Sequence, residues 1–106
     1  MTPDARFTQL LDDLKMLGVT QTPFFGRRGI TADGKVIAVF LDDSVAFKLG
    51  AAMPEHAKAL ALSDSELWHP GNRAVPFKDW VRVYAAHQDQ WARLAELALH
   101  HIRQKL

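Results

Sequence analysis

The sequence has no cysteine among its 106 residues. Disulfide frameworks, cysteine-based zinc sites, iron–sulfur clusters and thiol catalysis are therefore excluded, and the lack of cysteine suits a reducing compartment. No apolar run approaches the roughly 20 residues that a membrane-spanning helix needs. The first residues, Met1–Asp4, lack the basic and apolar regions of a secretory signal. We therefore expect a cytoplasmic protein that has no contact with a membrane.

The chain also lacks an excess of either charge. It has 13 Lys and Arg against 12 Asp and Glu, a formal net charge of +1. A dedicated nucleic-acid binder usually carries a basic excess on one face. A local excess lies in residues 71–106, where six basic side chains accompany three acidic ones. This balance predicts no more than weak binding to DNA or RNA.

What is present is typical of an ordinary globular protein: 48% of the residues are hydrophobic and 24% are charged. A chain of 11.9 kDa can bury about two-thirds of the surface that it exposes when unfolded, which is enough for one core. Two domains would each be near the lower size limit for independent folding. We therefore expect a single domain over residues 1–106.

Apolar residues at helical spacing mark both ends of the chain. A cap at Thr2-Pro3 and an expected end at Gly18 predict a helix over residues 4–17, with the stripe Phe7, Leu10, Leu11, Leu14 and Leu17. A second helix is predicted over residues 88–104, with the stripe Trp91, Leu94, Ala95, Ala98 and Ile102. Trp91 should be largely buried. A shorter helix is expected from Pro54 to about Leu62.

Residues 22–49 are predicted to form a β-meander. Asp33-Gly34 is a strong hairpin signal between strands 24–31 and 36–41, and Asp42-Asp43 is a second tight turn before strand 44–49. Another strand is predicted over residues 77–84, after a connection, residues 63–72, with a possible capping box at Ser63 and Glu66. The expected fold class is α+β: an antiparallel sheet (β-meander plus a later strand) with the N- and C-terminal helices packed on one face.

The middle strand, residues 36–41, is apolar on both faces, while the predicted helices cover only one face of the sheet. Uncovered, its second row of side chains would form an apolar patch that monomers rarely tolerate. Three covers are open: the aromatic side chains of Trp80 and Tyr84 from the later strand, a returning loop, or a symmetric second copy of the chain. We favour the homodimer.

Short sequence motifs occur in the predicted strands and in the connection between them. Phe24-Phe25-Gly26, Asp33-Gly34-Lys35 and Asp43-Ser44-Val45-Ala46-Phe47-Lys48-Leu49 occur in the first half. Glu66-Leu67-Trp68-His69-Pro70 and Val75-Pro76-Phe77-Lys78-Asp79-Trp80-Val81 occur in the second, before the helix that carries Trp91. In order and spacing, over about residues 22–102, the chain resembles the TfoX N-terminal domain family.

The resemblance implies a compact α+β domain without catalytic residues. In the full-length competence regulators of that family the domain is joined to a second, helical domain. The present chain ends at Leu106 without room for one, so roles that need the second domain are not expected. The pair Arg27-Arg28 departs from the family, whose members often have smaller or aromatic residues there.

Enzymatic patterns are weak. The serines lie in a predicted turn and a connection, and the paired carboxylates Asp12-Asp13 and Asp42-Asp43 suit a solvated helix face and a turn. Glu96 and His100 are spaced for a shared metal, but no third ligand is indicated. We therefore expect no catalytic residue, no metal and no cofactor.

The strongest binding signal is the alternating stripe Lys78, Trp80, Arg82 and Tyr84. Aromatic rings between cations can stack bases and hold phosphates, but the same pattern is common in cross-strand packing. Gly26-Arg27-Arg28-Gly29 has the letters of a KH-domain loop, although a bulge or a close backbone approach, with two exposed arginines, is the preferred interpretation. The candidate binding surface comprises Arg27, Arg28, Arg73, Lys78, Trp80, Arg82 and Tyr84.

The function we predict is that of a non-enzymatic module acting in regulation through protein–protein contacts or self-association. The alternative is a weak nucleic-acid-binding module that uses the basic and aromatic sheet face. Whether the basic residues converge on one open face separates the two hypotheses.

Overall fold

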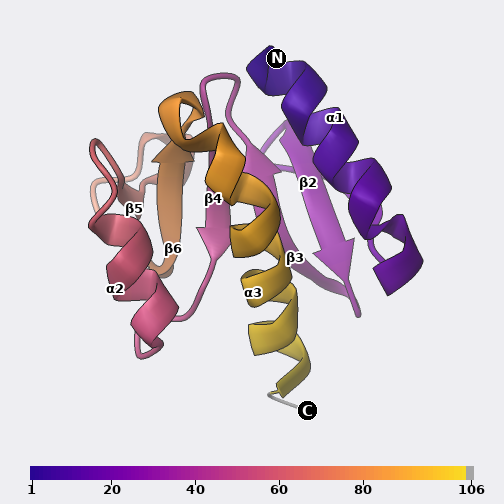
Figure 1. Ribbon diagram of the computed structural model, residues 1–106. Coiled ribbons are helices and arrows are strands. Elements are labelled where there is room, and N and C mark those ends of the chain that lie inside the picture. The colour runs from indigo at the N-terminus through magenta and orange to yellow at the C-terminus, as the bar shows by residue number, and fades with distance from the viewer. Residues whose placement is uncertain (105–106) are drawn as a thin grey trace.

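The computed structural model describes residues 1–104 of the chain (Figure 1). Its α-helices are α1 (Pro3–Leu14), α2 (Pro54–Leu60) and α3 (Trp91–Gln104), with short 3₁₀ helices η1 (Lys15–Leu17), η2 (Pro70–Asn72) and η3 (Ala85–Gln90). Its strands are β1 (Thr20–Phe24), β2 (Arg27–Ala32), β3 (Lys35–Phe40), β4 (Ser44–Lys48), β5 (Glu66–Trp68) and β6 (Phe77–Tyr84). No helix in the described part is long and apolar enough to span a membrane.

The six strands form one antiparallel sheet in the order β1-β2-β3-β4-β6-β5. Helices α1 and α3 lie side by side across one face of this sheet, and α2 lies on the same side near β6 (Figure 1). The main core fills the space between them, with Phe7 of α1, Phe47 of β4 and Trp91 of α3 fully buried. The predicted α+β fold with both terminal helices on one face is therefore confirmed.

The helix signals of the sequence have clear structural counterparts. The Thr2 hydroxyl accepts a hydrogen bond from the Ala5 N–H at 3.1 Å and caps α1, whose turn of 3₁₀ helix ends at Gly18 with a φ of 88°. Because that last turn departs from the α-helix, Leu17 is exposed and does not belong to the buried stripe. Trp91 is fully buried, as predicted, and its indole N–H donates to the Val83 carbonyl at 3.2 Å.

Two tight turns confirm the predicted meander. Asp33 and Gly34 have φ angles of 54° and 79°, the pattern of a type I′ hairpin turn between β2 and β3. Asp42, with a φ of 74°, turns the chain between β3 and β4, and the Leu41 N–H donates to the Ser44 carbonyl at 2.8 Å. Strand β6 spans the predicted residues 77–84.

Two strands were not foreseen. Residues 20–24 form β1, which joins β2 through a hairpin at Phe25-Gly26 instead of continuing into it as one strand. Glu66 lies on β5, so it is not the third residue of a helical capping box; Ser63 instead has its hydroxyl 3.0 Å from His87 Nε2. The predicted connection over residues 63–72 therefore contains the strand that completes the sheet.

A β-bulge changes which side chains of β3 share a face. Ile30 pairs with Ala38 while the next residue of β2 pairs with Val36, so Ile37 is an extra residue. Ile37, Ala38 and Phe40 consequently pack in the main core, and Val36 and Val39 face the other side. The expected strict alternation along this strand is wrong at this point. In strand 44–49 the alternation of apolar residues with Ser44, Ala46 and Lys48 predicts one wetter face. That prediction is wrong, since Ser44 and Ala46 are fully buried.

Candidate functional site

The sheet face opposite the helices is covered by the chain's own aromatic side chains. Val39, Ala46, Trp68 and Trp80 are buried there, and partly buried Phe24, Val36, Leu41 and Phe77 pack around them. The rings of Phe24 and Trp80 stack with centroids 6.1 Å apart, and those of Trp68 and Trp80 are 5.2 Å apart. We refer to Phe24, Phe25, Trp68, Phe77 and Trp80 as the aromatic cluster.

This cluster answers the question of how the second face is covered. Trp80 takes part, as the aromatic alternative predicts, but its partners Trp68 and Phe24 come from β5 and β1, the two strands that were not foreseen. Tyr84 instead lies beside the cluster, where its hydroxyl donates to Glu66 at 3.1 Å. The physical reason for expecting a dimer is therefore removed for β3, and the dimer itself stays a prediction.

Phe25 is the exposed member of the aromatic cluster. The residue is 52% exposed. Its ring lies edge-on to those of Phe24, Trp68 and Phe77, at centroid distances of 4.8, 6.1 and 6.1 Å. Phe25 and Gly26 are the two central residues of the β1–β2 hairpin, with φ angles of 51° and 71°. A bulky residue rarely adopts a positive φ, because its Cβ is crowded there. The other non-glycine residues with positive φ in the described chain are Asp33, Asp42 and Asp64.

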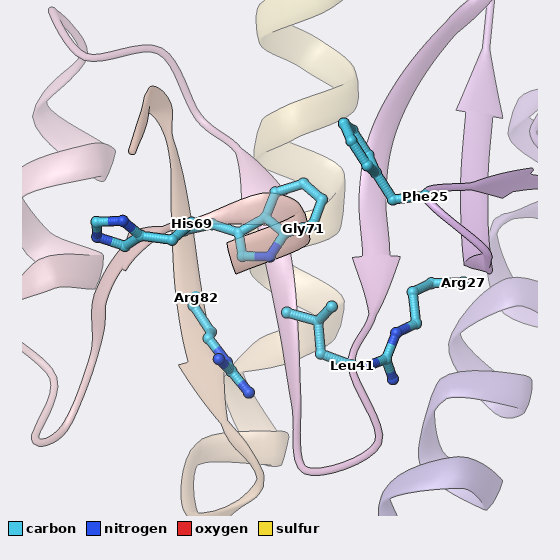
Figure 2. A pocket seen from close by; sticks show the side chains of 7 residues that line it. Phe25, Arg27, Leu41, His69, Gly71 and Arg82 are labelled. Atoms are coloured by element: carbon cyan, nitrogen blue, oxygen red, sulfur yellow. The ribbon is translucent and has the colours of Figure 1, made fainter. Parts of the chain in front are cut away.

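A hollow of about 240 Å³ opens beside Phe25. It is lined by Phe25, Arg27, Leu41, Trp68, His69, Gly71 and Arg82. Figure 2 shows Arg27 and Arg82 on either side of Leu41 at one end of the hollow. Phe25 lies at the other end, and the His69 ring points away from the hollow. The lining therefore combines an apolar floor with two guanidinium groups and contains no carboxylate.

Arg27 and Arg28 lie on opposite faces of the sheet, as adjacent strand residues must. Arg27 borders the hollow and donates to Asp42 at 2.7 Å. Arg28 is directed to α1, where it donates to Asp4 at 2.6 Å and lies 5.0 Å from the ring centre of Phe7. The two arginines therefore do not form one basic loop, and Arg27 is exposed whereas Arg28 is partly buried.

The glycine that follows the arginines has a packing role. A Cβ on Gly29 would lie 2.8 Å from the Thr22 carbonyl oxygen of β1. The residue is therefore needed for the close approach of β1 and β2, as the structural interpretation of this motif expects. The predicted bulge lies elsewhere, in β3.

Arg82 is held in a polar network at the edge of the hollow. It donates to the Ser44 hydroxyl at 2.7 Å and to Asp43 at 2.9 Å, and its remaining terminal nitrogen lies 4.0 Å from Glu66. Partial burial raises the pKa of Asp43, but the hydrogen bonds from Ser44 and Arg82 outweigh it and leave that pKa below its ordinary value. Arg82 is thus fixed in position by two hydrogen bonds, and its other terminal nitrogen donates no hydrogen bond to the described residues.

The pKa of Tyr84 moves in the other direction. Partial burial and the hydrogen bond to Glu66 raise it above the usual value of the phenol, although Arg82 acts against them. The Arg82 guanidinium also lies 4.9 Å from the ring centre of Tyr84. Tyr84 therefore remains a neutral donor that positions Glu66 next to Arg82.

The remaining predicted site residues differ in accessibility. The Arg73 guanidinium lies 5.1 Å from the ring centre of Phe77, at the rim of the aromatic cluster, and its carbonyl accepts from His69 Nδ1 at 3.0 Å. Lys78 is exposed, and its carbonyl accepts from the buried His56 Nε2 at 2.8 Å. Trp80 is only 6% exposed beneath Phe24 and Trp68, so its ring offers no free face for stacking.

The residues that sequence reasoning missed are Phe25, Leu41, Trp68, His69 and Gly71. A usable signal was present at one of them, because Phe precedes Gly at a place where a hairpin turn normally has Asn or Asp. The others come from segments assigned to a strand end or a connection, and no spacing rule relates them to Arg27 or Arg82.

Metal-ligating side chains do not converge in the described residues. A second hollow of about 330 Å³, at the end of α3, is bordered by Glu55, His100 and His101 among others. Nevertheless, no three His, Asp or Glu side chains within residues 1–104 are arranged to hold a metal ion. Glu96 and His100 therefore gain no third ligand in this part of the chain.

Comparison of the chain with protein-family models, with curated proteins and with solved structures gives no significant match.

Proposed function

We propose that this chain is a non-enzymatic binding module, of the TfoX N-terminal domain kind, that acts in regulation by contacting another protein through the hollow beside Phe25. The observation that carries the proposal is the conformation of Phe25, a half-exposed aromatic residue at a positive φ. Type I′ turns favour Asn, Asp or Gly at this position. Local backbone strain that the fold does not need is concentrated at functional sites.

The surroundings of Phe25 support a protein as the partner. Protein interfaces are enriched in aromatic residues and arginine, and their strongest contacts are made where such anchors meet a pocket. Here Phe25 and two arginines border one hollow. Another exposed apolar side chain, Val75, lies in the loop that precedes β6.

The nucleic-acid alternative has less support. Its predicted cations disperse: Arg28 is on the helix side, and Arg27 and Arg82 are paired with Asp42 and Asp43. Arg73 above Phe77 is the arrangement that best fits a stacked base and a phosphate. A polyanion, however, gains affinity mainly from several cations that release counterions, and paired arginines contribute little to that release.

Site-specific photo-cross-linking in cells tests the proposal. The photoreactive residue p-benzoylphenylalanine replaces Phe25 in one version of the full chain and Met16 in the other. Met16 is 96% exposed and lies in η1, so it controls for exposure alone. We expect discrete protein adducts from position 25 and none from position 16. An adduct of twice the 11.9 kDa mass of the chain would identify a second copy as the partner.

Two results would contradict the proposal. Equal adducts from both positions would mean that exposure, and not the hollow, determines capture. Adducts from position 25 that disappear after nuclease treatment would transfer the site to the nucleic-acid alternative.

A further inference from the structure

We infer that the hollow binds a short acidic segment of its partner, in which one carboxylate reaches Arg27 and Arg82 and a neighbouring apolar side chain rests on Phe25, Leu41 and Trp68. This inference rests on the proposed function and specifies the chemistry of the partner. It follows from the size of the hollow, from the hydrogen-bonding state of its two arginines and from the charges around them.

The size of the hollow favours a side chain over a whole small molecule. Sites for drug-sized ligands and cofactors usually enclose about 300–1,000 Å³. The hollow has about 240 Å³ and opens at the surface. This space suits one or two side chains of a segment that lies across the sheet face.

The two arginines supply pre-positioned donors. Arg27 uses one terminal nitrogen for Asp42 and keeps its remaining N–H groups for another acceptor, with 46% of its side chain exposed. Arg82 is oriented by Ser44 and Asp43, and its remaining terminal nitrogen is 4.0 Å from Glu66. A guanidinium whose position is already fixed loses little freedom when it binds a carboxylate. Arg27 is therefore the main anchor, and Arg82 contributes one further donor.

The apolar part of the hollow is equally pre-formed. The Trp68 ring is held by Trp80 and Phe77, at centroid distances of 5.2 and 5.9 Å. Phe25 stands beside it and is half exposed. Leu41, partly buried, lies between the two arginines (Figure 2). An aliphatic or aromatic side chain next to the bound carboxylate would cover these surfaces.

The local charge balance separates a carboxylate from a polyphosphate. Asp42, Asp43 and Glu66 surround the hollow without lining it, with 79%, 62% and 54% of their side chains exposed. They offset the charges of Arg27, Arg82 and the nearby Arg73, so there is no extended positive field to attract a polyanion. A single carboxylate needs only the remaining N–H donors of Arg27 and Arg82.

Titration by nuclear magnetic resonance tests the inference on the full chain. The probes are the capped peptides acetyl-Asp-Phe-Leu-amide and acetyl-Asn-Phe-Leu-amide, with an oligothymidylate as a third probe. The readouts are the indole N–H resonance of Trp68 and the amide resonance of Gly71, both in the lining. The indole of Trp91, buried on the other face, serves as an internal reference.

We expect the Asp peptide to shift the Trp68 and Gly71 resonances in a saturable way and to bind about tenfold more tightly than the Asn peptide, since a charge-assisted hydrogen bond is at stake. Arg27→Gln should abolish this difference. Arg93→Gln, an exposed arginine on α3, is the matched control and should preserve it. An unchanged Trp91 resonance in both variants would show that the fold is intact.

The outcomes distinguish the inference from the proposed function. Equal binding of both peptides, unaffected by Arg27→Gln, would overturn the carboxylate inference and leave a protein-binding hollow. No shift at about 1 mM peptide, a concentration that reveals millimolar affinity, would also overturn it. A response to the oligothymidylate alone would overturn both the inference and the proposed function.

Discussion

The two faces of the sheet are both dry, but they are covered in different ways. Three helices cover one face, and they bring together residues from the two ends of the chain, such as Phe7 and Trp91. Side chains of β1, β5 and β6 cover the other, and α1, α2 and α3 all lie on the opposite side (Figure 1). The first cover is a deep apolar layer, whereas the second is a single layer of rings.

The difference shows on which face of the sheet ring surface stays open to solvent. Rings that stand on strands can seal the backbone beneath them and still expose their edges. Trp68 and Trp80 are sealed, and Phe25 is open. The hollow lies where the single layer of rings meets the charged ends of the strands. A thin aromatic cover thus closes the sheet, and it is the surface through which the proposed function would operate.

The largest expected effect is on the helix side. Trp91→Ala should lower the free energy of unfolding by about 3–5 kcal/mol, the usual range for a buried aromatic residue. Trp91 is fully buried, and its loss leaves the Val83 carbonyl without its indole donor. Denaturant melts monitored by circular dichroism measure the change, with Trp91→Phe as a milder control. A loss below about 1 kcal/mol would mean that this face is not the main core.

A smaller effect is expected for the matched substitution on the other face. Trp80→Ala should cost about 2–3 kcal/mol, at or below the lower end of the same range, because the partly exposed Phe24 and Phe77 can move into the space. The same denaturant melts compare the two variants directly. Should Trp80→Ala cost as much as Trp91→Ala, the aromatic cluster would be a second core and not a thin cover.

The hydrogen bonds of Asp43 at the polar edge of the aromatic face should contribute less to the free energy of unfolding, and their contribution should depend on pH. The folded state lowers the pKa of Asp43, because its hydrogen bonds outweigh the opposing effect of burial. The stabilisation is therefore present above the unfolded pKa, about 3.9, and is lost as pH falls through the lower folded value. Asp43→Asn should remove this part of the acid dependence. The expected size is below about 1 kcal/mol, as for other solvent-exposed pairs.

Stability measured by denaturant melts between about pH 6 and pH 2 covers the range over which such a carboxylate titrates. Asp12→Asn, on the exposed side of α1, controls for the loss of one negative charge. An identical pH profile for Asp43→Asn and the unmodified protein would show that the network around Arg82 does not act on folding.

The smallest effect on stability is expected at the most exposed ring. Phe25→Asn exchanges ring contacts for a residue that suits the positive φ of the turn, so the free energy of unfolding should change by less than about 1 kcal/mol. Binding at the hollow should nevertheless be lost, as measured by the peptide titration. A large loss of stability would instead assign Phe25 a structural role and remove the main support for the proposed function.

Sequence reasoning succeeded where the signal is local. The apolar stripes of α1 and α3, the Asp33-Gly34 turn and the alternation along β6 each depend on residues a few positions apart. It failed for β1 and β5, because Thr-Gln-Thr-Pro-Phe has little apolar alternation and three residues are too few to form a pattern. The bulge at Ile37 follows from pairing with β2 and has no signature within β3 itself.

For the candidate site the outcome is mixed. Arg27 and Arg82 line the hollow, Arg73 and Tyr84 lie next to its walls, and Trp80 supports its floor from below. Arg28 is on the other face, and Lys78 forms no ion pair within residues 1–104. Residue types pointed to the correct face of β6. They did not show which arginines already form ion pairs, because the acidic partners Asp42 and Asp43 lie in a turn that is distant in the sequence.

The sequence by itself determined the fold class and the burial of Trp91, because helical periodicity and a two-residue turn act over short distances. Only the tertiary structure decided how the second face is covered and where it stays open. Phe25, Leu41, Trp68 and Arg82 come from four segments of the chain, and strand order and register bring them together. Register depends on pairing between distant segments, so a hollow built across it cannot be recognised from any one of them.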